Sequence, residues 1–165
     1  MINIVLLEPE IPQNTGNIAR TCAVTGSRLH IVGPIPFDIS DRAARRAGLD
    51  YWKDVEVLYY PSREAFFRQH PQEDGYFFTT KAERNHCQME YGPEPWLFFG
   101  RESSGIPEEI LVEHRERCVR IPMRPQERSL NLSNSVAIAV YEVLRQKDFA
   151  GLEQQGKLHH LEWKE

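Results

Sequence analysis

The chain has 165 residues, of which 41% are hydrophobic and 27% charged, with a formal net charge of −4, values that fit one globular domain with a sizeable core. No apolar run reaches the roughly 18 residues of a membrane span, and no secretory signal segment opens the chain. Its three cysteines are odd in number and widely spaced, which indicates neither a disulfide framework nor a metal site and fits a reducing cytoplasm.

Short apolar runs alternate along the chain with amphipathic segments. In chain order, we expect a strand at 2–7, a helix from Asn14 or Thr15 to Thr25, a strand at 29–32, a basic helix at 41–49, a strand at 55–59, a helix from Ser62 to near Pro71, strands at 76–80 and 96–99, a helix from Pro107 to Glu113, a strand at 118–121 and a helix from Asn131 to Lys147. The strands are continuously apolar, which is typical of a mostly parallel sheet covered on both faces. We therefore expect an α/β domain at 1–150, followed by a polar tail at 151–165.

The last expected helix is apolar on most of its surface. Its two stripes run through Val136, Val140, Val143 and Leu144 and through Ala137, Tyr141 and Leu144. A helix that is apolar all round is buried on all sides. The pattern leaves open whether this is the central helix of a monomer or a helix that meets a second subunit.

A first polar loop follows the first expected strand and contains Asn14, Asn17 and Arg20 at intervals of three. We expect a helix to place these side chains in one row at the ligand-binding edge of the sheet. An arginine there suits a phosphate or a developing oxyanion. The alternative is a helix cap with a surface arginine.

A second loop, Gly100-Arg101-Glu102-Ser103-Ser104-Gly105, lies between an expected strand and helix. Its glycines let backbone approach a ligand closely, and Glu102 could hold an amine, a hydroxyl or an arginine. The alternative is a plain turn in which Glu102 lies near a helix N-terminus, where the helix dipole favours it.

The third loop carries the densest polar pattern. After Ile121-Pro122-Met123 and a basic stretch, residues 129–134 place four hydrogen-bonding side chains in six positions, directly before an apolar helix. One helix cap needs only one such residue, and unpaired polar groups are costly to bury, so the surplus suggests a ligand. All three loops follow strands and could therefore gather at one edge of the sheet.

Missing motifs narrow the function. No Gly-x-Gly-x-x-Gly follows the first strand, no Walker-type loop is present, and no Gly-x-Ser-x-Gly occurs, which disfavours dinucleotide-binding enzymes, NTPases and one large hydrolase class. His30, in an expected strand, is more typical of a satisfied core residue than of a catalyst.

With these loops in view, the chain resembles the SPOUT class of RNA methyltransferases, and closely the TrmL (YibK-like) group. That group 2′-O-methylates the wobble nucleotide of certain tRNAs with S-adenosylmethionine. The resemblance runs over about residues 1–151 and rests on the segments 8–20, 45–51, 100–105 and 121–134. It implies a deep trefoil knot near the C-terminus, a rare exception to the rule against threaded chains. It also implies a homodimer, and leucine tRNAs as substrates.

The resemblance also assigns roles to residues. Those implied around the reacting hydroxyl are Arg20, Asn14, Glu102, Ser129 and Asn131. Those implied to hold the cofactor are Phe78, Thr79, Gly100, Ile121, Met123, Ser129, Leu130 and Asn134. Those implied to contact the tRNA anticodon stem-loop are Arg42, Arg45, Arg46, Arg124 and Arg128, for which a solvated face with ordinary ion pairs is the alternative. Because a guanidinium stays protonated, we expect Arg20 to stabilise the forming alkoxide and a neighbouring phosphate.

Three other functions remain open at this point: 2′-O-methylation at another tRNA or rRNA position, a non-catalytic module that binds S-adenosylmethionine and RNA, and a small-molecule α/β enzyme. The Arg20 and Ser129-x-Asn131 set disfavours the non-catalytic module. RNA binding would disfavour the small-molecule enzyme.

Overall fold

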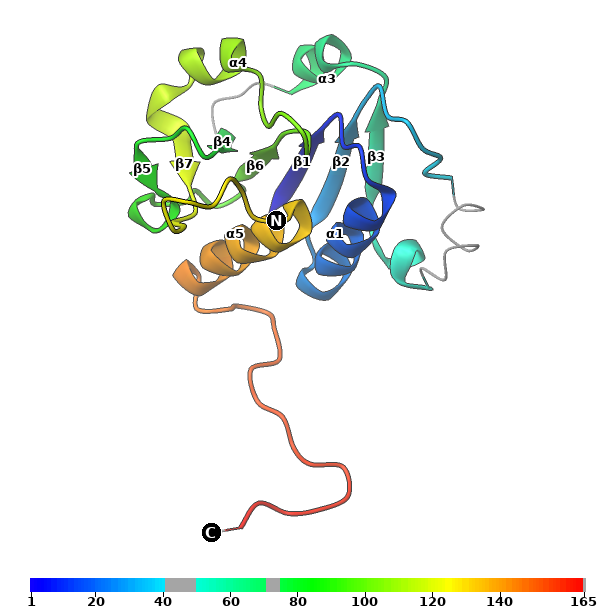
Figure 1. The fold of residues 1–165 in the computed structure, drawn as a ribbon. Helices are drawn as coiled ribbons and strands as arrows, with labels where there is room; N and C mark the ends of the chain where they lie inside the picture. Colours follow the sequence, from blue (N-terminus) through cyan, green and yellow to red (C-terminus); the bar gives the residue numbers. More distant parts are fainter. Residues whose placement is uncertain (41–49, 71–74, 165) are drawn as a thin grey trace.

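The computed structural model describes residues 1–40, 50–70 and 75–164. Within these residues, seven strands form one parallel sheet in the order β3-β2-β1-β6-β4-β7-β5 (Figure 1). The strands are β1 Asn3–Leu7, β2 Arg28–Val32, β3 Val57–Tyr60, β4 Gly75–Phe78, β5 Arg84–Asn85, β6 Trp96–Phe99 and β7 Cys118–Arg120. The expected parallel α/β fold is confirmed, while the trefoil knot stays a prediction of the resemblance.

The helices cover both faces of this sheet (Figure 1). In the described part of the chain they are α1 Pro12–Thr25, α3 Arg63–Gln69, α4 Glu108–Glu113 and α5 Leu132–Gln146, with short 3₁₀ turns η1 Asp50–Asp54, η2 His86–Gln88 and η3 Arg115–Arg117. Alternate residues of β1 point to opposite faces. Ile4 and Leu6 therefore pack in the core that includes α1 and α5, whereas Val5 and Leu7 pack in the core that includes α3 and α4.

Helix boundaries follow the expected signals with one correction. Ser62 caps α3 by accepting a hydrogen bond from the Ala65 amide, and Gly26 ends α1 in the left-handed conformation. However, α1 begins at Pro12 rather than at Asn14 or Thr15, because proline fits the first turn of a helix. Asn14 therefore does not cap the helix, and its side chain can point away from the first turn. The expected helix at 41–49 lies outside the described residues.

The sequence pattern did not predict β5, and it overstated the burial of α5. β5 has only two residues, both polar, so no apolar run marks it. In α5, Val136, Val140 and Val143 are fully buried, but Ile138 and Tyr141 are exposed. The described chain thus buries one side of α5 and leaves apolar side chains exposed on another. α5 lies beside α1 on the same face of the sheet (Figure 1).

His30 is a satisfied core residue, as expected. Its two ring nitrogens lie 3.1 Å from the Tyr60 hydroxyl and 3.2 Å from Asn3 Oδ1, and the Tyr60 hydroxyl lies 2.9 Å from His70 Nε2. Burial lowers the pKa of His30 to about 3, with further lowering from His70 and Arg28. The imidazole is therefore neutral in the folded protein.

The described chain beyond α5 has no helix or strand. Phe149 and Leu152 still pack against the core, and the chain then runs away from the domain up to residue 164 (Figure 1). None of the described helices is long and apolar enough to cross a membrane.

Candidate functional site

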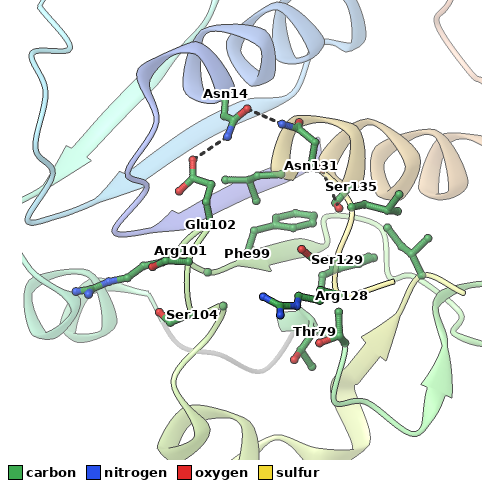
Figure 2. Close-up of a pocket in the computed structure, with 18 of the residues that line it drawn as sticks. Asn14, Thr79, Phe99, Arg101, Glu102, Ser104, Arg128, Ser129, Asn131 and Ser135 are labelled. Atoms are coloured by element: carbon green, nitrogen blue, oxygen red, sulfur yellow. Dashed lines mark hydrogen bonds between the residues drawn. The ribbon is translucent and has the colours of Figure 1, made fainter. Parts of the chain in front are cut away.

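A pocket of about 570 Å³ opens where the loops after four neighbouring strands meet (Figure 2). These loops follow β1, β6, β4 and β7, which lie side by side in that order. The carboxyl edge of a parallel sheet is where open α/β folds bind ligands. The convergence of the three polar loops expected from the sequence is confirmed, and the loop after β4 joins them.

Asn14 links three of the loops through its amide group (Figure 2). It is only 5% exposed, donates to Glu102 Oε1 at 3.0 Å and accepts from Asn131 Nδ2 at 3.0 Å. Asn131 is in turn fixed as the cap of α5, because its Oδ1 accepts from the amides of Ser133 and Asn134. Each amide has its donor and acceptor sides set by its neighbours.

Glu102 lies at the N-terminus of α1. Besides Asn14, its carboxylate accepts from the amide of Glu10 at 2.8 Å and from the amide of Ile11, the N-cap residue of α1, at 3.2 Å. A carboxylate is favoured there by the free amides and the helix dipole. Glu102 therefore does lie near a helix N-terminus, as the alternative interpretation of its loop predicted. The helix is α1, however, and not α4, which follows this loop in the sequence.

Two more acidic residues tie the same loops together, and the sequence pattern did not reveal them. The Glu10 carboxylate accepts from the amide and the hydroxyl of Ser103, both at 2.9 Å. Glu8 is buried, forms an ion pair with Arg101 and lies 3.0 Å from Nε of Arg63. The only available signal was the pair of acids around Pro9, with no indication of partners more than 50 residues away.

The glycines at 100 and 105 are required by the backbone. A Cβ atom at Gly100 would overlap the backbone of Gly105 and Ile106, and Gly105 has a φ of +72°. The loop closes on itself through the Gly105 amide, which donates to the Arg101 carbonyl at 2.9 Å. Only glycine fits both constraints without strain.

Most residues expected to hold the cofactor line this pocket. They are Phe78, Thr79, Gly100, Ile121, Met123, Ser129 and Leu130. Asn134 is not among the lining residues, and its amide instead donates to Asn131. Phe99 was missed; its ring stacks on that of Phe78 with centroids 4.8 Å apart. The lining therefore offers apolar surface beside hydroxyl, amide and carboxylate groups.

Of the residues expected at the reacting hydroxyl, Asn14, Glu102, Ser129 and Asn131 line the pocket, but Arg20 does not. Arg20 is exposed on α1, with its guanidinium carbon 5.6 Å from the centre of the Tyr51 ring. Residues three apart are neighbours on a helix, but each step of three falls about 60° short of a full turn, so Arg20 lies about 120° around α1 from Asn14. Asn14 accordingly faces the pocket, while Asn17 and Arg20 face solvent.

The expected RNA-contacting arginines fall into two groups. Arg128 lines the pocket, Arg124 is exposed, and within the described residues neither has a carboxylate within 4 Å. Arg42, Arg45 and Arg46 lie outside the residues that the structure describes.

Comparison with known proteins gives consistent matches. The model of the SpoU rRNA Methylase family matches residues 1–141. A tRNA (cytidine(34)-2′-O)-methyltransferase of Saccharophagus degradans is 46% identical over 92% of this chain and 99% of its own length. An enzyme of the same name from Aeromonas hydrophila is 46% identical over 94% of this chain and its full length. A solved structure, described as giving insights into 2-OH methylation of C/U34 on tRNA, superposes with a TM-score of 0.81 at 40% identity, over 90% of this chain and 91% of that one.

Proposed function

Because the chain belongs to the SpoU rRNA methylase family, we propose that it is a tRNA 2′-O-methyltransferase. It transfers a methyl group from S-adenosylmethionine to the ribose 2′-hydroxyl of nucleotide 34, the wobble nucleotide. The observation that carries the proposal is the pocket joined by Asn14, Glu102 and Asn131, in a chain 46% identical to enzymes named for this reaction. Cytidine and modified uridine as target nucleotides, and leucine tRNAs as substrates, are part of the proposal.

The pocket suits S-adenosylmethionine by its shape and chemistry. Gly100 lets the 100–105 loop fold closely on itself, because its Cβ position is taken by the backbone of Gly105 and Ile106, and the folded loop forms one wall of the pocket. Met123 and Leu130 supply apolar surface for the adenine, and Thr79 and Ser129 supply hydroxyl groups. Once bound, S-adenosylmethionine provides a methyl group on a positively charged sulfur.

The polar network positions the acceptor ribose. A 2′-hydroxyl is a weak nucleophile until its proton is polarised or removed. The amides of Asn14 and Asn131 and the hydroxyl of Ser129 can orient that hydroxyl toward the methyl group, and such positioning supplies a large share of the rate. Arg20 lies outside this pocket, and its planar guanidinium suits a phosphate of the bound RNA beside the reacting ribose.

The position of Arg20 determines which surface the bound RNA must cover. Arg20 lies six residues beyond Asn14 on α1, about 9 Å along the helix axis. The RNA must therefore cover both the pocket mouth and the exposed face of α1. An Arg20→Lys variant keeps the charge but loses the planar fork, and we expect it to lose most of its turnover. Native turnover in this variant would exclude the bidentate role.

A homodimer is part of the proposal and is supported by the open face of α1 and α5. Val24, Ile138 and Tyr141 are exposed there, at 60%, 39% and 48%. Adjacent exposed apolar side chains are typical of protein interfaces. Light scattering should give twice the chain mass, and a Val24→Asp variant should shift toward the monomer. A monomeric native protein would exclude this arrangement.

Methyl transfer to total tRNA from a strain that lacks the protein tests the proposal directly. The tRNA is incubated with labelled S-adenosylmethionine, digested with nuclease and analysed by mass spectrometry. We expect label on the ribose of nucleotide 34 with the native protein and with a Glu94→Gln control, whose side chain is exposed away from the pocket. An Asn131→Ala variant should transfer far less. Label at another position would overturn the assignment of nucleotide 34, and no label would overturn the activity.

A further inference from the structure

Glu8 has an unusual backbone for its residue type. It lies between the last residue of β1 and Pro9, has a φ of +53° and is only 7% exposed. Side-chain-bearing residues rarely adopt this left-handed conformation, in which glycine is favoured. The chain therefore keeps a carboxylate at a backbone position that glycine would occupy with less strain.

Glu8 joins three elements, two through its carboxylate and one through its backbone amide. It forms an ion pair with Arg101 in the loop after β6, and it lies 3.0 Å from Nε of Arg63 at the start of α3. The Glu8 amide donates to the Val32 carbonyl at 2.7 Å, which anchors the residue to the end of β2. The carboxylate is thus a fixed point between α3 and the loop after β6.

Arg101 connects this fixed point to the pocket. It lines the pocket and directly precedes Glu102, the carboxylate that holds Asn14 (Figure 2). Ser103, the next residue, is held by Glu10. Three consecutive residues of the loop after β6 are therefore each bound to the segment that follows β1.

We infer that Glu8 is a positioning residue for the cofactor pocket, and that it acts by holding Arg101 and with it the 100–105 loop. Arg101 is half exposed at the pocket wall and lies next to Glu102. Without Glu8, its guanidinium would be free to turn into the pocket or into solvent. The loop would then populate conformations that do not fit the cofactor. The inference rests on the proposed function, which supplies both S-adenosylmethionine as the probe and the methyl transfer whose kinetics are measured.

Calorimetric titration of the full-length protein with S-adenosylmethionine tests the inference. We expect both Glu8→Gln and Glu8→Gly to weaken binding by about tenfold, the change for one charge-assisted contact. Glu8→Gly removes the whole side chain but relieves the backbone, so that weaker binding in this variant cannot come from backbone strain. Glu109→Gln is the matched control, since Glu109 is the exposed outer partner of Arg63, at 3.4 Å. It should bind like the native protein.

A double variant separates action through Arg101 from a general loss of structure. If Glu8 acts through Arg101, then Glu8→Gln combined with Arg101→Gln should bind no more weakly than Glu8→Gln alone. The KM for S-adenosylmethionine should rise, while kcat at saturating cofactor stays within about twofold, because Glu8 does not touch the reacting groups. Melting temperatures of all variants verify that they are folded.

Two results would overturn the inference. Native affinity in Glu8→Gly would mean that the residue only forms a turn, and independent losses that multiply in the double variant would mean that Arg101 is not its route. If the native protein itself fails to bind S-adenosylmethionine, the proposed function fails instead, so the two failures are distinguishable.

Discussion

Replacing Glu102 by glutamine tests the network at the N-terminus of α1. The native carboxylate accepts three hydrogen bonds, from the amides of Glu10 and Ile11 and from the side chain of Asn14, at 2.8, 3.2 and 3.0 Å. Glutamine has nearly the same shape but only one acceptor oxygen. If this oxygen serves Ile11 and Asn14, the new NH₂ group faces the amide of Glu10. If the side chain flips, Ile11 and Asn14 lose their acceptor.

Either orientation leaves at least one donor opposite another donor. A donor left without a partner costs about 1–3 kcal/mol, and the lost charge at the helix N-terminus costs about 0.3–1 kcal/mol more. Because Glu102 is half-buried and water can reach part of the site, we expect about 2 kcal/mol. For a chain of this length, that lowers the melting temperature by roughly 4–8 °C.

Differential scanning calorimetry and titration with S-adenosylmethionine are the assays. We expect Glu102→Gln to show both the lower melting temperature and weaker cofactor binding, since the loop that carries Glu102 forms one wall of the pocket. Glu94→Gln is a suitable control, because Glu94 is exposed and does not line the pocket. A Glu102→Gln variant with native melting temperature and native affinity would refute the reasoning.

Three further outcomes follow from the structure. In the folded protein the pKa of His30 is about 3, against about 6.5 in an unfolded chain; the unfolded chain takes up the proton first as pH falls. The stabilisation from His30 is therefore complete above pH 6.5 and is lost toward pH 3, at about 1.4 kcal/mol per pH unit. In a His30→Gln variant, the free energy of unfolding from denaturant titrations should depend less steeply on pH over this range. The same slope in both proteins would contradict this. Gly100→Ala should abolish S-adenosylmethionine binding in calorimetry, because its Cβ would overlap the backbone of Gly105, and tight binding would show that the loop can open without loss. An Arg124→Gln/Arg128→Gln double variant should weaken tRNA binding in filter assays. The slope of the logarithm of the binding constant against the logarithm of salt concentration should become shallower by about two. An unchanged slope would exclude both arginines from the RNA contact.

The sequence predicted the parallel sheet and most of its helices because buried strands and capped helices leave local signals. Ser62, Gly26 and Asn131 mark helix ends by chemistry that acts over a few residues. The pocket lining came largely from the resemblance rather than from local pattern. What neither supplied were the contacts of Glu8 and Glu10 with Arg101 and Ser103, since these depend on β1 lying beside β6.

The neighbourhood of β1 and β6 also affects how a nascent chain reaches its fold. β1 is buried on both faces, and its partner on one side, β6, starts 93 positions later in the register pair Asn3 and Trp96. At about 5–20 residues per second of synthesis, that edge of β1 waits roughly 5–20 s for its neighbour. During this interval an apolar strand edge is open to pairing with other chains. The arrangement that brings Asn14 next to Glu102 thus also leaves one edge of β1 in the newly made N-terminal half unpaired until β6 has been synthesised.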